Sequence, residues 1–164
     1  MKKQNKMQIK LSYILLLLFF IISCDSGLKP QPENTSYVRG TIKYVNSTDN
    51  WPTVDSLKDL RVVAFKHFPP DNIIQEVLSG QAYYTNSTLP FYVDSSSFVL
   101  EIKDAPVELK YIAVAQQFGG IIDWLVVGVY SDNKDSAKTL FVEKGKNYQI
   151  QINVDFKNLP KQPF

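Results

Sequence analysis

The chain is poor in the residues that most often carry chemistry. Its 164 residues include one cysteine and one histidine. A single cysteine cannot form an internal disulfide, and one histidine with no second thiol does not make a zinc site. No apolar run reaches the roughly 20 residues of a membrane-spanning helix. These shortages exclude a disulfide scaffold, a zinc cluster and a helical transmembrane bundle.

The N-terminus has the order of a secretory signal. Four lysines precede the apolar run Leu11–Ile22, and Ser23 and Cys24 follow it. Because a small residue stands directly before the only cysteine, the segment resembles a bacterial lipoprotein signal with its lipobox. The resemblance implies a signal helix, cleavage after residues 1–23 and a lipid on Cys24. An uncleaved anchor with a coincidental cysteine is the alternative.

Cleavage would reverse the sign of the net charge. The signal carries four of the 18 basic residues and no acid, so the mature chain would have a charge near −2. No basic patch remains, and we expect no binding of nucleic acid. Lipid on Cys24 would make the membrane the first partner, with nearly permanent attachment when two or three acyl chains are present. We expect the chain in a membrane of the bacterial envelope, the outer one favoured over the inner.

The segment 24–35 is expected to be a flexible tether. It contains Gly27, Pro30 and Pro32 among polar residues and shows no apolar periodicity. The residues 36–164 that follow are long enough for one hydrophobic core, and we expect them to form a single domain.

Apolar and polar residues alternate with period two in several stretches of this domain. Tyr148–Phe156 shows the alternation most clearly, followed by Phe98–Ile102 and, more weakly, Val38–Tyr44. This pattern is typical of strands with one buried face.

Other stretches are apolar on both faces. They predict interior strands over Leu60–Phe68, Tyr111–Ala115 and Trp124–Tyr130, and shorter ones over Leu89–Val93 and Thr139–Val142. The segments between them are rich in Asp, Asn, Ser and Gly and are expected to be turns. They include residues 94–97 and 131–133.

One segment has a helical pattern. Asp71 or Asn72 can cap a helix, Ile73, Ile74, Val77 and Leu78 share a face, and Gly80 can end it, so we predict a short helix near 72–79. With eight or nine short strands and no βαβ rhythm, the chain is expected to be an all-β, antiparallel two-sheet sandwich.

A family likeness supports this fold. The stretches that carry it are Gly40–Ile42, Leu60–Phe65, Phe98–Ile102, Ala105-Pro106 and Leu109–Val114. Over residues 36–155 they resemble the transthyretin-like (prealbumin-like) sandwich of carboxypeptidase regulatory-like domains, which is related in shape to immunoglobulin-like sandwiches. The glycine usual in the turn before the last stretch is absent; Asp104–Val107 stands there.

The likeness implies a protein that is not an enzyme. Such domains usually act as structural or binding modules, without catalytic residues or cofactors. Transthyretin-like hydroxyisourate hydrolases need several histidines and a C-terminal Tyr-Arg-Gly-Ser motif, whereas this chain has only His67 and ends Gln162-Pro163-Phe164. We predict no catalytic residue and no metal or other cofactor.

The remaining polar candidates have simpler interpretations. His67 is expected at a strand end. Asp132, Asn133 and Asp135 are close in sequence, but the glycine and distal glutamate of an EF-hand loop are missing, so a polar hairpin turn is predicted. Asp123 is expected to cap a turn after Gly119-Gly120; pairing with a base such as Arg61 is the alternative.

Aromatic residues are the best candidates for a binding site. Trp51, Tyr83, Tyr84 and Trp124 are candidate ligand-binding residues, because rings with polar neighbours often bind sugars or peptides. The alternative is that they cover the ends of the sandwich. The predicted function is therefore a non-enzymatic envelope lipoprotein, a structural or interaction module with an envelope protein or glycan as partner. The second hypothesis is a carbohydrate- or peptide-binding lipoprotein of a nutrient-uptake assembly. The C-terminal tail, Phe156–Phe164, is expected to pack on the domain.

Overall fold

The structure is a computed structural model that describes residues 35–70, 72–133 and 136–163. The predicted signal peptide (1–23), the lipidation site Cys24 and the tether up to residue 34 lie outside the described residues. Within the described part, no helix is long and apolar enough to cross a bilayer.

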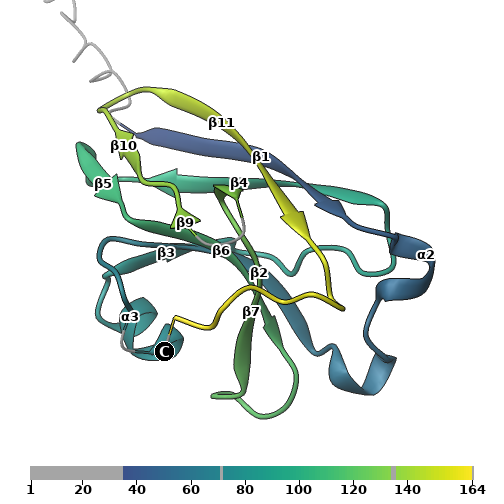
Figure 1. Ribbon diagram of the computed structural model, residues 1–164. Helices are drawn as coiled ribbons and strands as arrows, with labels where there is room; N and C mark the ends of the chain where they lie inside the picture. Colours follow the sequence, from purple (N-terminus) through teal and green to yellow (C-terminus); the bar gives the residue numbers. More distant parts are fainter. Residues whose placement is uncertain (1–34, 71, 134–135, 164) are drawn as a thin grey trace, which may run out of the picture. The chain divides into compact units, whose positions relative to one another are not determined.

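The domain is mostly β, and Figure 1 shows its main sheet. The sheet has seven strands in the order β3-β2-β6-β7-β11-β1-β4. Their bounds are β1 Ser36–Tyr44, β2 Asp59–Phe65, β3 Ala82–Tyr84, β4 Ser95–Ile102, β6 Tyr111–Gln117, β7 Trp124–Val129 and β11 Asn147–Val154. Two small sheets join β5 (Val107–Leu109) to β10 (Leu140–Val142) and β8 (Ser131–Asn133) to β9 (Ser136–Ala137).

The prediction of an antiparallel two-sheet sandwich is wrong in two respects. The main sheet curls until its edge strands β3 and β4 approach each other, which makes it a nearly closed, barrel-like sheet. In addition β1 and β11 run parallel, from Tyr37 opposite Asn147 to Tyr44 opposite Val154. Period-two alternation is the same for both strand directions and for open and closed sheets, so the sequence pattern could not distinguish them.

Strands β2, β6 and β7 are buried on both faces, as predicted. One face lies in the main core, to which Leu60, Val62 and Ile112 belong. The other face forms a second, smaller core that includes Val63, Phe65, Tyr111 and Val126, and Ile73 of the short helix packs into it. Two cores on opposite sides of the same strands explain why Val62–Phe65 and Tyr111–Ala115 are apolar on both faces.

The predicted helix is present as α3, Ile73–Leu78. The Asn72 side chain accepts hydrogen bonds from the backbone N–H groups of Ile74 (2.9 Å) and Gln75 (3.2 Å), which makes it the N-cap. At the other end Gly80 has φ +72° and donates to the Val77 carbonyl, as in a Schellman motif. Two shorter helical segments, α2 (Ser47–Asn50) and η1 (Val54–Ser56), have no counterpart in the prediction.

Other predicted boundaries shift. Leu89–Val93 is not a strand, although Leu89 is buried and its N–H donates to the Leu60 carbonyl at 2.8 Å. The predicted turns 94–97 and 131–133 instead contain strand residues, because β4 begins at Ser95 and β8 spans Ser131–Asn133. Ser96 of β4 points inward, and its hydroxyl lies 2.9 Å from that of Tyr44. A hydroxyl pair thus takes a core position that sequence patterning assigns to apolar residues.

The C-terminal tail contacts β7 through one side chain. Gln162 Nε2 donates to the Val126 carbonyl at 3.0 Å, and the Val126 N–H donates to Gln162 Oε1 at 2.8 Å. The ladder between β7 and β11 begins only at Gly128 and Val129, so the Gln162 amide satisfies backbone groups that the ladder leaves open.

Replacing Gln162 by alanine is expected to lower the free energy of unfolding by about 1–3 kcal/mol, because it leaves the buried N–H and C=O of Val126 without partners. Denaturant unfolding of the full chain measures the loss. Lys161→Ala, an exposed neighbour, is the control and should change stability little. Equal stability of both variants would contradict this role of the tail.

Candidate functional site

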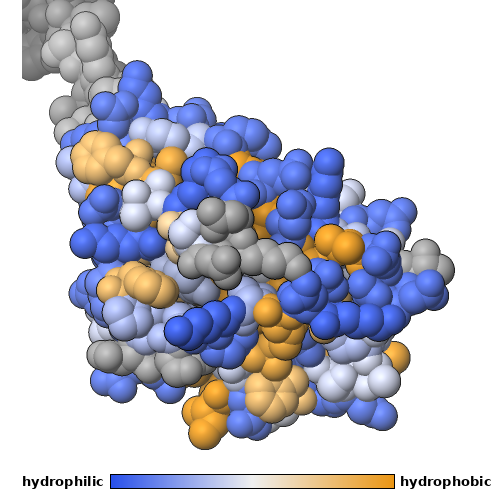
Figure 2. Space-filling model, in the orientation of Figure 1, coloured by the Kyte–Doolittle hydropathy of each residue, from blue (hydrophilic) through white to orange (hydrophobic). Residues whose placement is uncertain are grey.

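The β6–β7 turn carries the most prominent exposed apolar group described by the structure. The exposed fractions are 44% for Phe118, 77% for Ile121 and 75% for Ile122. Figure 2 shows hydrophobic spheres at the lower end of the view, where Figure 1 places this turn. We call Phe118, Ile121 and Ile122 the apolar tip. Three large apolar side chains together on one turn indicate a surface that contacts something else.

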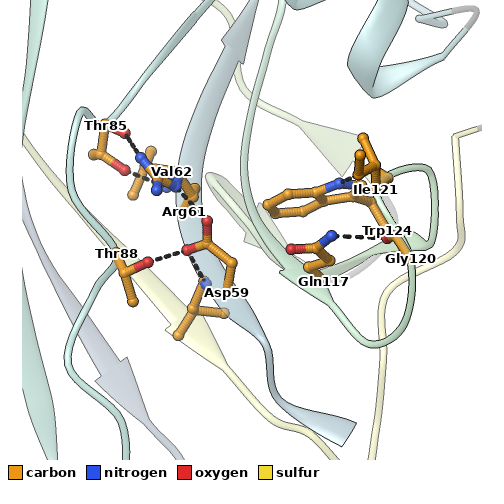
Figure 3. A network of polar contacts seen from close by, with 10 residues as sticks. Asp59, Arg61, Val62, Thr85, Thr88, Gln117, Gly120, Ile121 and Trp124 are labelled. Atoms are coloured by element: carbon orange, nitrogen blue, oxygen red, sulfur yellow. Dashed lines mark hydrogen bonds and ion pairs between the residues drawn. The ribbon is translucent and has the colours of Figure 1, made fainter.

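Hydrogen bonds within the turn hold the apolar tip in shape (Figure 3). Asp123 Oδ2 accepts from the Gly120 N–H at 2.6 Å, and the Gly120 carbonyl accepts from Gln117 Nε2 at 2.7 Å. The prediction that Asp123 caps this turn is therefore confirmed. The indole N–H of Trp124 donates to the Ile121 carbonyl at 2.8 Å. A turn fixed in this way loses little conformational entropy when it binds.

Trp124 connects the turn to the second core. Its ring is half-buried and packs against the second core, which contains Val126 and Ala115. The indole thus joins the rigid sheet to the apolar tip and does not offer a free flat face. Of the four predicted ligand-binding aromatics, Trp124 is the one closest to the tip in sequence and contact.

A polar network fixes β2 beside this region (Figure 3). Arg61 Nε lies 2.7 Å from Asp59 Oδ2, and Arg61 Nη1 donates to the Thr85 carbonyl at 2.7 Å. Thr88 donates to the other oxygen of Asp59. Arg61 therefore pairs with Asp59 and not with Asp123. The network joins β2 to the segment after β3.

Trp51 lies elsewhere, in an aromatic cluster. Its ring centroid is 4.5 Å from that of Tyr44, 4.8 Å from Phe156 and 5.4 Å from Tyr92. The ring packs against the main core from the polar loop in which the sequence places it. Its Nε1 is buried and has no hydrogen-bond partner within the described residues. The packing gives Trp51 a part in the core at this end of the sheet.

Tyr83 and Tyr84 point to opposite sides of β3. Tyr83 packs against the main core, and its hydroxyl donates to Asp104, which also accepts from Lys66 Nζ at 2.8 Å. Burial, together with the Asp104 carboxylate, raises the pKa of Tyr83. Tyr84 is 45% exposed on the outer side.

The free energy of unfolding is expected to depend on pH at acidic values through the Asp104 carboxylate. Burial alone would raise its pKa, but hydrogen bonds from Lys66 and Tyr83 outweigh burial and hold the pKa of Asp104 below its usual range. This stabilisation is complete above the unfolded pKa of about 3.9 and is lost as the pH falls through the folded pKa. Asp104→Asn should therefore flatten the decline of stability below about pH 4, measured by urea unfolding. An unchanged slope would contradict the contribution.

The predicted aromatic residues do not form one site. Trp51, the pair Tyr83-Tyr84, and Trp124 lie in three separate sets of contacts. The sequence interpretation missed the apolar tip, whose signal was an Ile-Ile pair next to Gly119-Gly120 and outside any polar alternation.

The other polar candidates have structural partners. His67 follows the end of β2, as predicted, and its Nε2 lies 2.7 Å from Glu76 Oε1 of α3. Asp132 belongs to the small β8–β9 hairpin, and its carboxylate contacts Lys138 Nζ at 2.7 Å. Among residues 35–70, 72–133 and 136–163, no three His, Cys, Asp or Glu side chains are grouped to hold a metal; Asp135 lies outside these ranges.

A hollow lies between the C-terminal tail and the start of β6. Its volume is about 730 Å³, and Phe68, Tyr111 and Pro160 line it together with Gln162. Phe68 stacks on Tyr111 with ring centroids 4.9 Å apart, and burial raises the pKa of Tyr111 to about 12. Lys110 and Lys161 also line this hollow, and none of its described lining residues is acidic.

Comparisons with protein families, curated proteins and solved structures found no match to this chain. The residues themselves therefore carry the functional inference.

Proposed function

We propose that the protein is a non-enzymatic interaction module of the bacterial envelope, held to a membrane by lipid on Cys24, the outer membrane being favoured. The observation that carries the proposal is the apolar tip on a turn fixed by its own hydrogen bonds. The likeness to transthyretin-like, carboxypeptidase regulatory-like domains supports it, because such domains usually serve as structural or binding modules.

The apolar tip supplies a driving force for association. Fully burying an Ile or Phe side chain contributes about 1.5–3 kcal/mol, and Ile121 and Ile122 expose three quarters of their surface. The carbonyls of Gly120, Ile121 and Ile122 already accept hydrogen bonds within the turn. Burying the tip against a partner therefore leaves these three groups satisfied.

In-cell photo-crosslinking tests this function. A photoreactive amino acid replaces Ile121 in the full chain, and a second variant carries it at Val54, which is 73% exposed in η1. We expect a discrete crosslinked envelope partner from position 121 and none from position 54. Ile122→Ser in the 121 variant should reduce the yield about tenfold or more. Equal crosslinking from both positions, or none from 121, would contradict the proposal.

The membrane anchor has its own test. Cells that express the full chain are labelled with an alkyne analogue of palmitate, and the label is expected on the wild-type chain and not on Cys24→Ala. Fractionation of the envelope then shows which membrane holds it. A labelled Cys24→Ala chain would exclude lipidation at this cysteine.

A second function, peptide or carbohydrate capture in a nutrient-uptake assembly, is favoured by a different feature. A hollow of about 380 Å³ lies between the edge strands β3 and β4 and is lined by Tyr37 and Tyr84. It shares no residue with the apolar tip, so the two functions can be tested separately.

A further inference from the structure

The edge strands β3 and β4 face each other without pairing. They are the two ends of the seven-stranded order, and no strand ladder joins them in the part of the chain described. Some of their Cα atoms nevertheless lie within 8 Å of each other. Paired strands are 4.7–4.9 Å apart. The sheet therefore stops short of closure at this point.

The free backbone groups of β4 can be assigned from its ladder with β1. The Tyr44 N–H donates to the Asp94 carbonyl at 3.1 Å, and Tyr44 and Asp94 continue the register in which Gly40 is opposite Phe98. In an antiparallel ladder every second residue bonds to the partner, and those between point the other way. Val99 and Glu101 thus direct N–H and C=O toward β3.

The same alternation assigns the free groups of β3. Thr85 N–H donates to the Val62 carbonyl at 3.0 Å, and Lys66 N–H donates to the Gln81 carbonyl at 3.0 Å. Ala82 and Tyr84 lie between these bonded positions, so their N–H and C=O groups point away from β2 and toward β4. Both sides of the gap therefore present unpaired backbone donors and acceptors.

Side chains complete this gap as a binding groove. Tyr84 and Val99 are about half exposed on its outer side, at 45% and 50%. Tyr37 of β1 adds a ring that the Arg39 guanidinium covers at 4.7 Å. Lys103 Nζ lies 3.8 Å from Glu101 Oε2, so the groove has one charge of each sign. Its walls thus suit an uncharged, partly apolar ligand.

We propose that the groove between β3 and β4 binds an extended polypeptide segment as an added strand. The proposal deepens the peptide-capture function proposed above and rests on it. Backbone N–H and C=O groups on two facing edges match an extended peptide, which offers the same groups on both of its sides at the strand repeat. Side chains that point outward from the bound segment would contact Tyr84, Val99 and Tyr37.

The groove opens from one end. A strand between β3 and β4 would need its two neighbours roughly 9.6 Å apart, twice the usual spacing. Near the start of β3 the Tyr83 hydroxyl and Lys66 hold Asp104, which follows β4. The other end of β3 leads into residues 85–94, which contain no strand. The bound segment therefore enters beside Tyr84 and Val99, at the end away from Asp104, where Thr85 keeps β3 bonded to β2.

Amide hydrogen exchange measured by NMR tests the proposal on the full chain in detergent micelles. The probe is a library of capped octapeptides in which Val, Ile, Tyr or Phe alternates with Ser or Thr. We expect exchange at Val99, Glu101, Ala82 and Tyr84 to slow at least tenfold at saturating peptide. A library N-methylated at every second amide, which cannot donate toward one edge, should lose this protection.

Two matched proline variants locate the site. Val99→Pro removes an N–H that faces the groove without removing a bond to β1, whereas Ser97→Pro removes the equivalent N–H outside the groove lining. We expect at least tenfold weaker peptide binding for the first and little change for the second. If Val99→Pro fails to fold, Tyr84→Ser replaces it, with loss of outward side-chain contact and weaker binding expected.

Several outcomes would overturn the proposal. They are unchanged exchange at all four amides, equal protection by the N-methylated library, or equal binding by both proline variants. Binding of maltohexaose without binding of peptides would assign the groove to glycans. Crosslinking at Ile121 is unaffected by these results, because it reports on the apolar tip alone.

Discussion

Replacing Gly40 by alanine is expected to lower the free energy of unfolding by about 3 kcal/mol, the upper part of the range for overpacked cores. A Cβ at this position would lie 2.4 Å from the Ile150 carbonyl oxygen and 2.6 Å from the Phe98 ring. Because β1 is paired with β11 on one side and β4 on the other, its backbone cannot move away from both. The Phe98 ring occupies the space above the glycine.

Chemical denaturation of Gly40→Ala, Phe98→Ala and the double variant measures this packing. The double variant should be more stable than the sum of the single effects predicts, because removing the ring relieves one of the two clashes. The double variant is still expected to be less stable than the wild type, since the clash with the Ile150 carbonyl remains. Thr41→Ala, on the opposite face of β1, is the control. A loss below about 0.5 kcal/mol for Gly40→Ala would refute the close approach.

Phe65→Ala is expected to cost about 3–5 kcal/mol, the usual range for truncating a buried phenylalanine. Phe65 is fully buried in the second core, with its ring centroid 6.0 Å from that of Tyr111. Phe65 lies on the side of the sheet that faces away from the main core, and this side would be exposed to solvent if the second core were absent. Phe68→Ala is the matched control, because Phe68 is 52% exposed, and about 1 kcal/mol or less is expected.

Hydrogen exchange separates global from local effects of Phe65→Ala. The second core also contains Ile73 of α3, so the cavity should loosen the helix before the main core opens. Amides of α3 are therefore expected to lose protection more than those of β1. Equal loss in both elements would mean that the second core and the main core unfold together.

The longer strands could be located from the sequence because burial of one face produces an alternation of apolar and polar residues. Tyr148–Phe156 alternates, and β11 covers Asn147–Val154. The helix was predictable for a chemical reason, since Asn72 and Gly80 supply a cap and a left-handed residue. Strands β3, β8 and β9 have two or three residues each, too few for any period to appear.

The site was harder to predict because exposure depends on neighbours distant in sequence. Trp51 lies in a polar loop, yet Tyr44 and Phe156 cover it from other elements. The strand Trp124–Tyr130 was predicted close to the bounds of β7, but the sequence did not indicate that Ile121 and Ile122 on the preceding turn are exposed. The pairing of strand edges, on which the groove depends, likewise has no local signature.

The parallel pairing of β1 with β11 has a consequence for the order of folding. The first strand of the domain lies between β4 and the last strand, so its sheet cannot be completed until residue 154 has been made. At 5–20 residues per second, a ribosome needs on the order of ten seconds to reach that point after β1 appears. Contacts so distant along the chain also form slowly. Over this interval the domain cannot complete its main sheet. An incompletely folded chain can pass through a translocation channel, which the proposed export requires.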